Sequence, residues 1–197
     1  DPLIEINGNL AGNSDGLRIT AGNSVVKGLV INNFQQSGIV LASAGGNIVE
    51  GNYLGTNTAG TSAAGNLFGV KIEAGSSGNR IGTNGDNVND AAEKNLISGN
   101  VYDGVIISGS NNNIVAGNLI GTNLAGTAAV PNNHGVRIES GSQANRVGTA
   151  GDGVADAAER NLISGNRLAG VFIIDAETAG NIVAGNYVGT NAAGTAS

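Results

Sequence analysis

Residues 51–61 read GNYLGTNTAGT, and this stretch returns with small changes as GNLIGTNLAGT at 117–127 and as GNYVGTNAAGT at 185–195. The copies begin 66 and 68 residues apart. Between them the motif NLISGN occurs at Asn95 and again at Asn161, also 66 residues apart. Self-similarity at a fixed spacing is typical of repeat proteins, in which each unit packs on its neighbours. The sequence therefore predicts a solenoid.

A shorter repeat lies inside the 66-residue period. The shortest unit, residues 16–37, contains three strand-like runs, GLRIT, SVVKG and LVINN, separated by Gly, Asn and Ser. The repeating unit is thus a coil of three short strands, 22 residues long where it carries no insertion. Each coil opens with Gly, an aliphatic residue, any residue and a second aliphatic residue, starting at Gly16, Gly38, Gly69, Gly104, Gly135 and Gly170.

Alternation along each strand predicts which side chains point into the coil. Four aliphatic residues per coil are expected to stack on similar residues of the next coil. They are Leu17, Ile19, Ile39, Leu41, Val70, Ile72, Val105, Ile107, Val136, Ile138, Val171 and Ile173 in the first strand, Val25, Val49, Ile81, Val115, Val147 and Val183 in the second, and Ile31, Leu54, Ile97, Ile120, Ile163 and Val188 in the third.

Asparagine precedes the second strand in every coil and the third strand in five of six. Such rows suit ladders at bends, where each amide bonds its neighbour one coil away and the backbone tolerates a left-handed conformation. The residues are Asn23, Asn47, Asn79, Asn113, Asn145 and Asn181 before the second strand, and Asn52, Asn95, Asn118, Asn161 and Asn186 before the third.

Together these patterns predict an all-β fold, a three-sided parallel solenoid of about six coils. Residues 1–197 are expected to form one domain, with residues 1–15 as a partial first coil whose strand-like run aligns with the third strand. At about 4.8 Å per coil, six coils make a rod roughly 29 Å long.

The insertions alternate between two corners of the coil. They follow the third strand in the coils opening at Gly38, Gly104 and Gly170, and the second strand in those opening at Gly69 and Gly135. A protruding loop is about 10 Å thick and a coil rises only about 4.8 Å, so insertions at one corner fit every second coil.

Both insertion corners flank the third strand, whose outward row is apolar. We expect the loops to fold over this row as a second small core, and a binding face is the alternative interpretation. The row comprises Val30, Tyr53, Leu96, Leu119, Leu162 and Tyr187.

The motifs NLISGN, GNxIGTNxAGT and GVxI resemble the repeats of right-handed parallel β-helices of the pectin-lyase-like superfamily. The resemblance covers essentially the whole chain and is closest to β-helix repeats arrayed in tandem in very large secreted or surface-attached bacterial proteins. It implies right-handed coiling and an extracellular or cell-surface location. That superfamily contains polysaccharide lyases, glycoside hydrolases, epimerases and adhesins, so the resemblance leaves function open.

Composition excludes several partners. The chain has 34 Gly and 29 Asn among 197 residues, a net charge of −6 and only nine Lys and Arg, which argues against nucleic acid. No apolar run is long enough for a membrane span, and no basic region followed by an apolar stretch predicts a signal peptide. Because the chain starts at Asp1, we interpret it as a segment of something longer. With no Cys, the sequence does not indicate a redox compartment.

Two acidic insertions share the pattern GDxVxDAAE. One interpretation is a capping box opening a single helical turn, with Asp90 or Asp156 as N-cap and Glu93 or Glu159 three residues on. The alternative is a Ca²⁺ site, because Ca²⁺ accepts irregular oxygen coordination. The candidate metal ligands are Asp86, Asp90, Glu93, Asp152, Asp156 and Glu159.

Charged residues on the outward rows of the first and second strands suggest a polysaccharide or cell-surface glycan as partner. Arg and Lys engage carboxylates or sulfates well, whereas three Phe and three Tyr offer little sugar stacking. Pairing among the charges themselves is the other interpretation. The candidate ligand-binding residues are Lys71, Glu73, Arg80, Arg137, Glu139, Arg146 and Phe172.

No catalytic residue is assigned, because one active site needs groups that break the repeat and the charged residues mostly repeat. The single His134 is expected to hydrogen-bond Asp103. A lyase-like site would have to use Asp175, Glu177, Arg137 and Glu139.

The function expected from the sequence is a rigid structural or adhesion-type module of a large exported protein, with glycan contacts as an added role. A polysaccharide lyase or glycoside hydrolase is the alternative. Further coils are expected on both sides in the parent protein, and end-to-end self-association is expected of this segment because strand edges at both ends lack partners.

Overall fold

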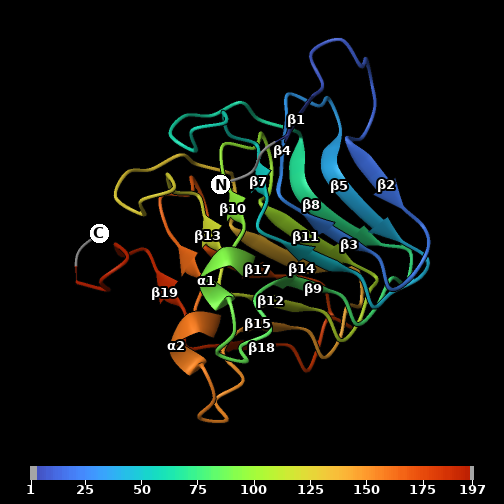
Figure 1. Ribbon diagram of the computed structural model, residues 1–197. Helices are drawn as coiled ribbons and strands as arrows, with labels where there is room; N and C mark the ends of the chain where they lie inside the picture. The colour runs from blue at the N-terminus through green and yellow to red at the C-terminus, as the bar shows by residue number, and fades with distance from the viewer. Residues whose placement is uncertain (1–3, 196–197) are drawn as a thin grey trace.

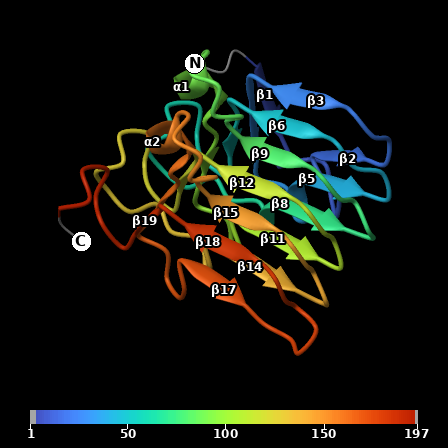
Figure 2. The same ribbon diagram turned by 90° about the horizontal axis from the view of Figure 1, so that it is seen from below.

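The computed structural model describes residues 4–195 and shows a three-sided parallel β-helix. Three parallel sheets run side by side along the molecule, and each successive coil adds one strand to each sheet (Figure 1). Figure 2 shows the strands of the second sheet and those of the first sheet as two rows. The predicted all-β solenoid is confirmed, with six full coils preceded by one further strand.

Each sheet collects one strand position of the coil. The first sheet contains β2 (Leu17–Ile19), β5 (Ser37–Ala42), β8 (Phe68–Glu73), β11 (Val105–Ser108), β14 (Val136–Glu139) and β17 (Val171–Ile173). The second contains β3 (Val25–Lys27), β6 (Ile48–Glu50), β9 (Arg80–Gly82), β12 (Ile114–Ala116), β15 (Arg146–Gly148) and β18 (Ile182–Ala184). The third contains β1 (Ile4–Asn7), β4 (Leu29–Asn32), β7 (Tyr53–Leu54), β10 (Leu96–Ile97), β13 (Leu119–Ile120), β16 (Leu162–Ile163) and β19 (Tyr187–Val188).

The core is a set of aliphatic stacks inside the coil. Ile72, Ile107 and Ile138 occupy register positions of the first sheet in successive coils, and all three are fully buried. Val49, Ile81, Val115 and Val147 form the equivalent stack of the second sheet, and the third sheet stacks Ile31, Leu54, Ile97, Ile120 and Ile163. The predicted inward rows are therefore confirmed in every coil but one.

The exception is the second strand of the first coil. Val25 was expected inside, but it pairs with the outward Ile48, and it is 54% exposed whereas Val26 is 6% exposed. Because two identical valines are adjacent, alternation does not predict which of them points inward. The choice is made by the bend, where the Ser24 amide donates to Asn47 Oδ1, so that Ser24 and not Asn23 begins the ladder.

Asparagine ladders stabilise the corners. At the bend before the second strand, the backbone and side-chain amides of Asn79 both donate to Asn113 Oδ1, at 2.9 and 2.8 Å, and the pattern continues to Asn145 and Asn181. The ladder before the third strand runs Asn52, Asn95, Asn118, Asn161 and Asn186. A third ladder, which the sequence did not indicate to us, lies after the third strand and consists of Asn66, Asn100, Asn132 and Asn166.

The insertions form layers outside the third sheet. Those after the second strand each contain one helical turn, α1 (Asp90–Glu93) and α2 (Asp156–Glu159), and the two turns contact each other. Those after the third strand are small hairpins closed by the antiparallel bridges Thr56–Ala63 and Thr122–Ala129. Loops two coils apart touch, since the Leu124 amide donates to the Gly60 carbonyl. Because the two kinds of insertion alternate along the chain, each insertion stacks on another of its own kind.

Between residues 4 and 195, none of the helices is long and apolar enough to cross a membrane.

Candidate functional site

The outer face of the first sheet holds five of the seven candidate ligand-binding residues. Its outward row has the predicted register, in which Lys71 lies between Val40 and Ile106, and Arg137 lies between Ile106 and Phe172. Glu73 and Glu139 lie on the same face, two residues along their strands. Arg80 and Arg146 lie on the second sheet, so the seven residues form two separate groups.

The charges at the N-terminal half of this face are paired with one another. Lys71 Nζ lies 2.7 Å from Glu73, and Arg18, two coils away, reaches the same carboxylate at 2.9 Å. The hydrogen bond from Lys71, and then the one from Arg18, hold the pKa of the Glu73 carboxyl below its ordinary value despite partial burial. The buried Val40 occupies the outward position between Arg18 and Lys71.

Toward the C-terminal end, a non-repeating cluster forms around a buried carboxylate. His134 Nδ1 lies 2.7 Å from Asp103 Oδ1, which confirms the expected hydrogen bond, and Asp103 is buried. Arg137 pairs with Glu139 at 2.5 Å and lies 3.9 Å from the second Asp103 oxygen. Arg137 Nε is, within residues 4–195, the one buried side-chain polar atom with no hydrogen-bond partner.

Aromatic rings run beside this cluster as two stacked pairs. His134 and Phe172 have centroids 4.9 Å apart at 21°, and Phe68 and Tyr102 have centroids 5.6 Å apart at 29°. Arg137 also lies 5.9 Å from the centre of the Phe172 ring. Stacked rings direct faces at each other, so the faces in contact are not available for a sugar. The sequence analysis did not find the Phe68–Tyr102 pair, because the two rings come from different positions of consecutive coils.

The two arginines of the second sheet are anchored to the acidic insertions. Arg80 bonds the Gly82 carbonyl, Glu50 at 3.0 Å and Glu93 at 3.4 Å. Arg146 bonds the Gly148 carbonyl at 2.7 Å and Glu159 at 3.2 Å. The four candidate cations, Lys71, Arg80, Arg137 and Arg146, therefore all have carboxylate partners in the same chain.

The carboxylates of the acidic insertions close their own loops. Asp90 accepts hydrogen bonds from the Thr83 hydroxyl at 2.6 Å and the Asn87 amide at 3.1 Å. Glu93 accepts the Asn84 amide at 3.0 Å. Asp156 and Glu159 repeat this arrangement with Thr149, Gly153 and Ala150.

The predicted capping box is therefore wrong. The N-caps of α1 and α2 are Asn89 and Ala155, both in left-handed conformation, and neither makes a side-chain cap hydrogen bond. Asp90 and Asp156 are already the first helical residues, and their carboxylates bond to the loop before the helix. Asp90 and Asp156 thus join each insertion to the end of the preceding second-sheet strand and do not cap the helical turn.

Two remaining carboxylates of the candidate metal set lie at the loop tips. Asp86 and Asp152 each accept the amide two residues on, from Val88 and Val154. Among residues 4–195, no group of three or more His, Cys, Asp and Glu side chains is arranged to hold a metal ion. Calcium binding stays a prediction, for which a Ca²⁺-dependent rise in melting temperature is the measurement.

The lyase-like set is brought together only in part. Arg137 and Glu139 form their ion pair, whereas Asp175 accepts the Ser140 amide at 2.8 Å. The Glu177 backbone carbonyl accepts a hydrogen bond from Gln143. Asp175 and Glu177 thus stabilise the tight corner after the first strand.

The apolar row outside the third sheet is covered by the insertions, which confirms the predicted second core. Val30, Tyr53 and Leu96 are buried together with Leu119 packed against them. The Gly60 hairpin passes so close that a side chain there would meet Leu96. Burial raises the pKa of the Tyr53 hydroxyl.

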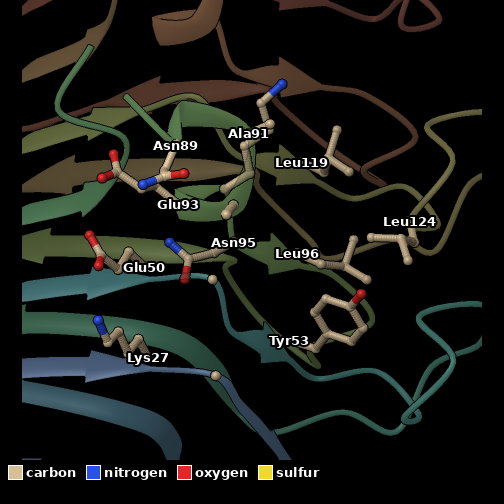
Figure 3. Close-up of a pocket in the computed structure, with 14 residues that line it drawn as sticks. Lys27, Glu50, Tyr53, Asn89, Ala91, Glu93, Asn95, Leu96, Leu119 and Leu124 are labelled. Atoms are coloured by element: carbon tan, nitrogen blue, oxygen red, sulfur yellow. The ribbon is translucent and has the colours of Figure 1, made fainter. Parts of the chain in front are cut away.

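A cleft of about 930 Å³ opens beside this second core. Figure 3 shows Lys27, Glu50 and Glu93 on one side and Tyr53, Leu96, Leu119 and Leu124 on the other. Its walls are α1, the tight corners of the first two coils and the hairpin that carries Leu124. The sequence analysis did not find it, because it forms where an insertion is absent.

Comparison with models of protein families, with curated proteins and with solved structures gave no match.

Proposed function

We propose that this chain is a rigid structural or adhesion-type spacer module of a large exported protein, located outside the cell or at its surface. The observation that carries the proposal is how the repeated polar residues are used. Within each of the three asparagine ladders, the side chains bond to one another along the axis. The repeated arginines bond to their own insertions. Repetition therefore serves the continuity of the coil, which is what a spacer requires.

The finer assignment, to the repeats of the pectin-lyase-like superfamily in large bacterial surface proteins, rests on the motifs NLISGN and GNxIGTNxAGT. The parallel coil with asparagine ladders is compatible with it. Under this proposal the chain holds other domains of its parent protein at a fixed distance.

Mechanical unfolding tests the spacer role. The chain is placed between two marker domains of known unfolding force and pulled by its ends. Because coils share ladders and stacks with their neighbours, we expect the chain to unfold in one or a few cooperative steps. At forces below the first step, the folded rod should keep its length. Gradual extension at low force, without a resolved step, would contradict the proposal.

Glycan binding at the first-sheet face is the second candidate. It is favoured by the non-repeating cluster of Asp103, His134, Arg137 and Phe172, in which the Arg137 Nε donor has no partner. Calorimetric titration with acidic oligosaccharides should give heat that Arg137→Ala abolishes and the distant Arg146→Ala preserves. Absence of heat with every acidic glycan tried would remove this candidate.

Incubation of the chain with acidic polysaccharides, with and without Ca²⁺, separates binding from the enzymatic alternative. Unsaturated or reducing-end products lost in Arg137→Ala would replace the spacer proposal with a lyase or hydrolase. Intact polysaccharide is the outcome that the proposal predicts.

A further inference from the structure

The cleft beside α1 lies where the alternating pattern of insertions lacks one insertion. α1 and α2 lie in coils two apart and contact each other, so each of these two insertions has the other beside it on one side. Two coils before α1, the corner is the tight turn Lys27–Gly28–Leu29 with no insertion. The cleft thus opens toward a corner at which the pattern would place an acidic insertion (Figure 3).

The walls of this cleft carry positive charge that has no partner in the described chain. Lys71 and Arg80 have carboxylates within 4 Å, whereas Lys27 and Lys94, which both line the cleft, have none among residues 4–195. Glu50 and Glu93 also line it, but both bond Arg80. The lining holds two lysines and two glutamates, and Arg80 offsets part of the acidic charge, so Lys27 and Lys94 offer an acidic group an ion-pair partner.

The tip of the α2 insertion has the complementary chemistry. Residues 150–154 are all exposed, four of them Ala, Gly or Val, and Val154 is 48% exposed. Within residues 4–195, Asp152 makes no ion pair and accepts one hydrogen bond, from the amide of Val154. The tip therefore presents a carboxylate next to an apolar side chain on a narrow loop.

We propose that residues 150–154 of one copy insert into the α1 cleft of a second copy. Asp152 then lies near Lys27 or Lys94, and Val154 packs toward the apolar wall at Leu119 and Leu124. Within one molecule the α2 tip lies beyond α1 from the first two coils, so the occupant comes from another molecule. Tip and cleft are different surfaces, so the contact is heterologous and extends from molecule to molecule.

Paired variants of the full chain test this contact by sedimentation velocity. Lys27→Glu with Lys94→Glu destroys the cleft and keeps the tip, whereas Asp152→Lys destroys the tip and keeps the cleft. Wild type should associate with increasing concentration, and each variant alone should need at least about tenfold more protein to do so. Arg167→Glu is the matched control, because Arg167 is an exposed cation that lies away from the cleft and has no ion pair in the described part of the chain.

Mixing the variants gives the decisive result. The intact tip of the Lys27→Glu/Lys94→Glu variant fits the intact cleft of the Asp152→Lys variant, and the two reversed surfaces are also opposite in charge. The mixture should therefore associate near the wild-type concentration, whereas each variant alone stays monomeric there. Thermal melting of each variant checks that it is folded. Monomeric wild type at hundreds of micromolar would overturn the proposal. Association that survives in both variants would also overturn it and would assign the contact to the ends of the solenoid.

Discussion

The two acidic insertions, residues 83–94 and 149–160, show which parts of the repeat the fold requires. Both use a threonine hydroxyl bonded to the first helical aspartate, Thr83 to Asp90 and Thr149 to Asp156. In both, the helical glutamate accepts hydrogen bonds from a loop amide and from an arginine. These contacts join the loop to the strand before it, so the repeat preserves them.

The two insertions differ in contacts other than these shared hydrogen bonds. Arg80 has a second carboxylate, Glu50, whereas the residue one period later is Ala116. Arg160 bonds the Tyr187 hydroxyl at 3.1 Å and lies over its ring, whereas Lys94, one period earlier, makes no ion pair within residues 4–195. Arg80 is thus shared between the first insertion and the neighbouring strand of the second sheet, and the first insertion leaves a cleft at the third sheet.

The largest expected effect comes from breaking the stack that joins the two periods. Ile107 lies between Ile72 and Ile138 in register and is fully buried. Ile107→Asp places an unpaired charge there, which we expect to cost more than about 4 kcal/mol and to abolish cooperative folding of both periods. Calorimetry checks this, with the outward and half-buried Ile114→Asp as control. A normal melting transition in Ile107→Asp would mean that the inward register is wrong.

Removal of the loop-closing aspartates should affect both periods in the same direction. Asp90→Ala and Asp156→Ala each leave a threonine hydroxyl and a backbone amide without an acceptor, which costs roughly 1–3 kcal/mol. Because Asp90 is more buried than Asp156, its replacement should lower the free energy of unfolding more. Urea denaturation measures both values. If neither variant differs from wild type, the aspartates do not hold the loops.

Exchange of the second carboxylate sharpens the comparison at Arg80 and Arg146. Glu50→Ala should destabilise the chain by about 0.5–1 kcal/mol, since Arg80 keeps Glu93. Ala116→Glu should also lower the free energy of unfolding, because Ala116 is fully buried and a larger, charged side chain does not fit there. Urea denaturation of the two single variants measures both values. A gain in stability for Ala116→Glu would contradict this expectation.

The smallest effect is the acid dependence at Glu73. Its folded-state pKa is lowered by Lys71 and Arg18, so the stabilisation is present above the unfolded pKa and is lost as pH falls through the folded value. Between neutral pH and the acid range below about pH 4, wild type should therefore lose more stability than Glu73→Gln. Thermal melting against pH measures this difference, and parallel curves for the two proteins would contradict it.

Most of the fold followed from alternation because like residues repeat at like positions. Ile72, Ile107 and Ile138 sit at the same place in coils of different length, so the period identified their side of the strand. Alternation failed at Val25 and Val26, where two identical residues are adjacent and a hydrogen bond from Ser24 makes the choice. The third ladder was missed because its first asparagine, Asn66, follows an insertion that interrupts the spacing.

The candidate site was less predictable because its contacts cross coils. Lys71 and Glu73 share a strand face, so their pairing could be expected from the sequence. Arg18 reaches Glu73 from two coils away, and Arg80 reaches Glu50 from the neighbouring coil. The cleft depends on an insertion that the first coil lacks, and only the arrangement of the coils makes that gap visible.

Native-state hydrogen exchange tests the central claim, that the asparagine ladders are part of the rigid frame, most directly. The backbone amides of Asn79, Asn113 and Asn118 donate to side-chain oxygens of the next coil. The account predicts that they exchange as slowly as the strand amides of Ile107 and Val115, and only through global unfolding. Exchange of these ladder amides at the rate of the exposed loop residues 86–89 would contradict it.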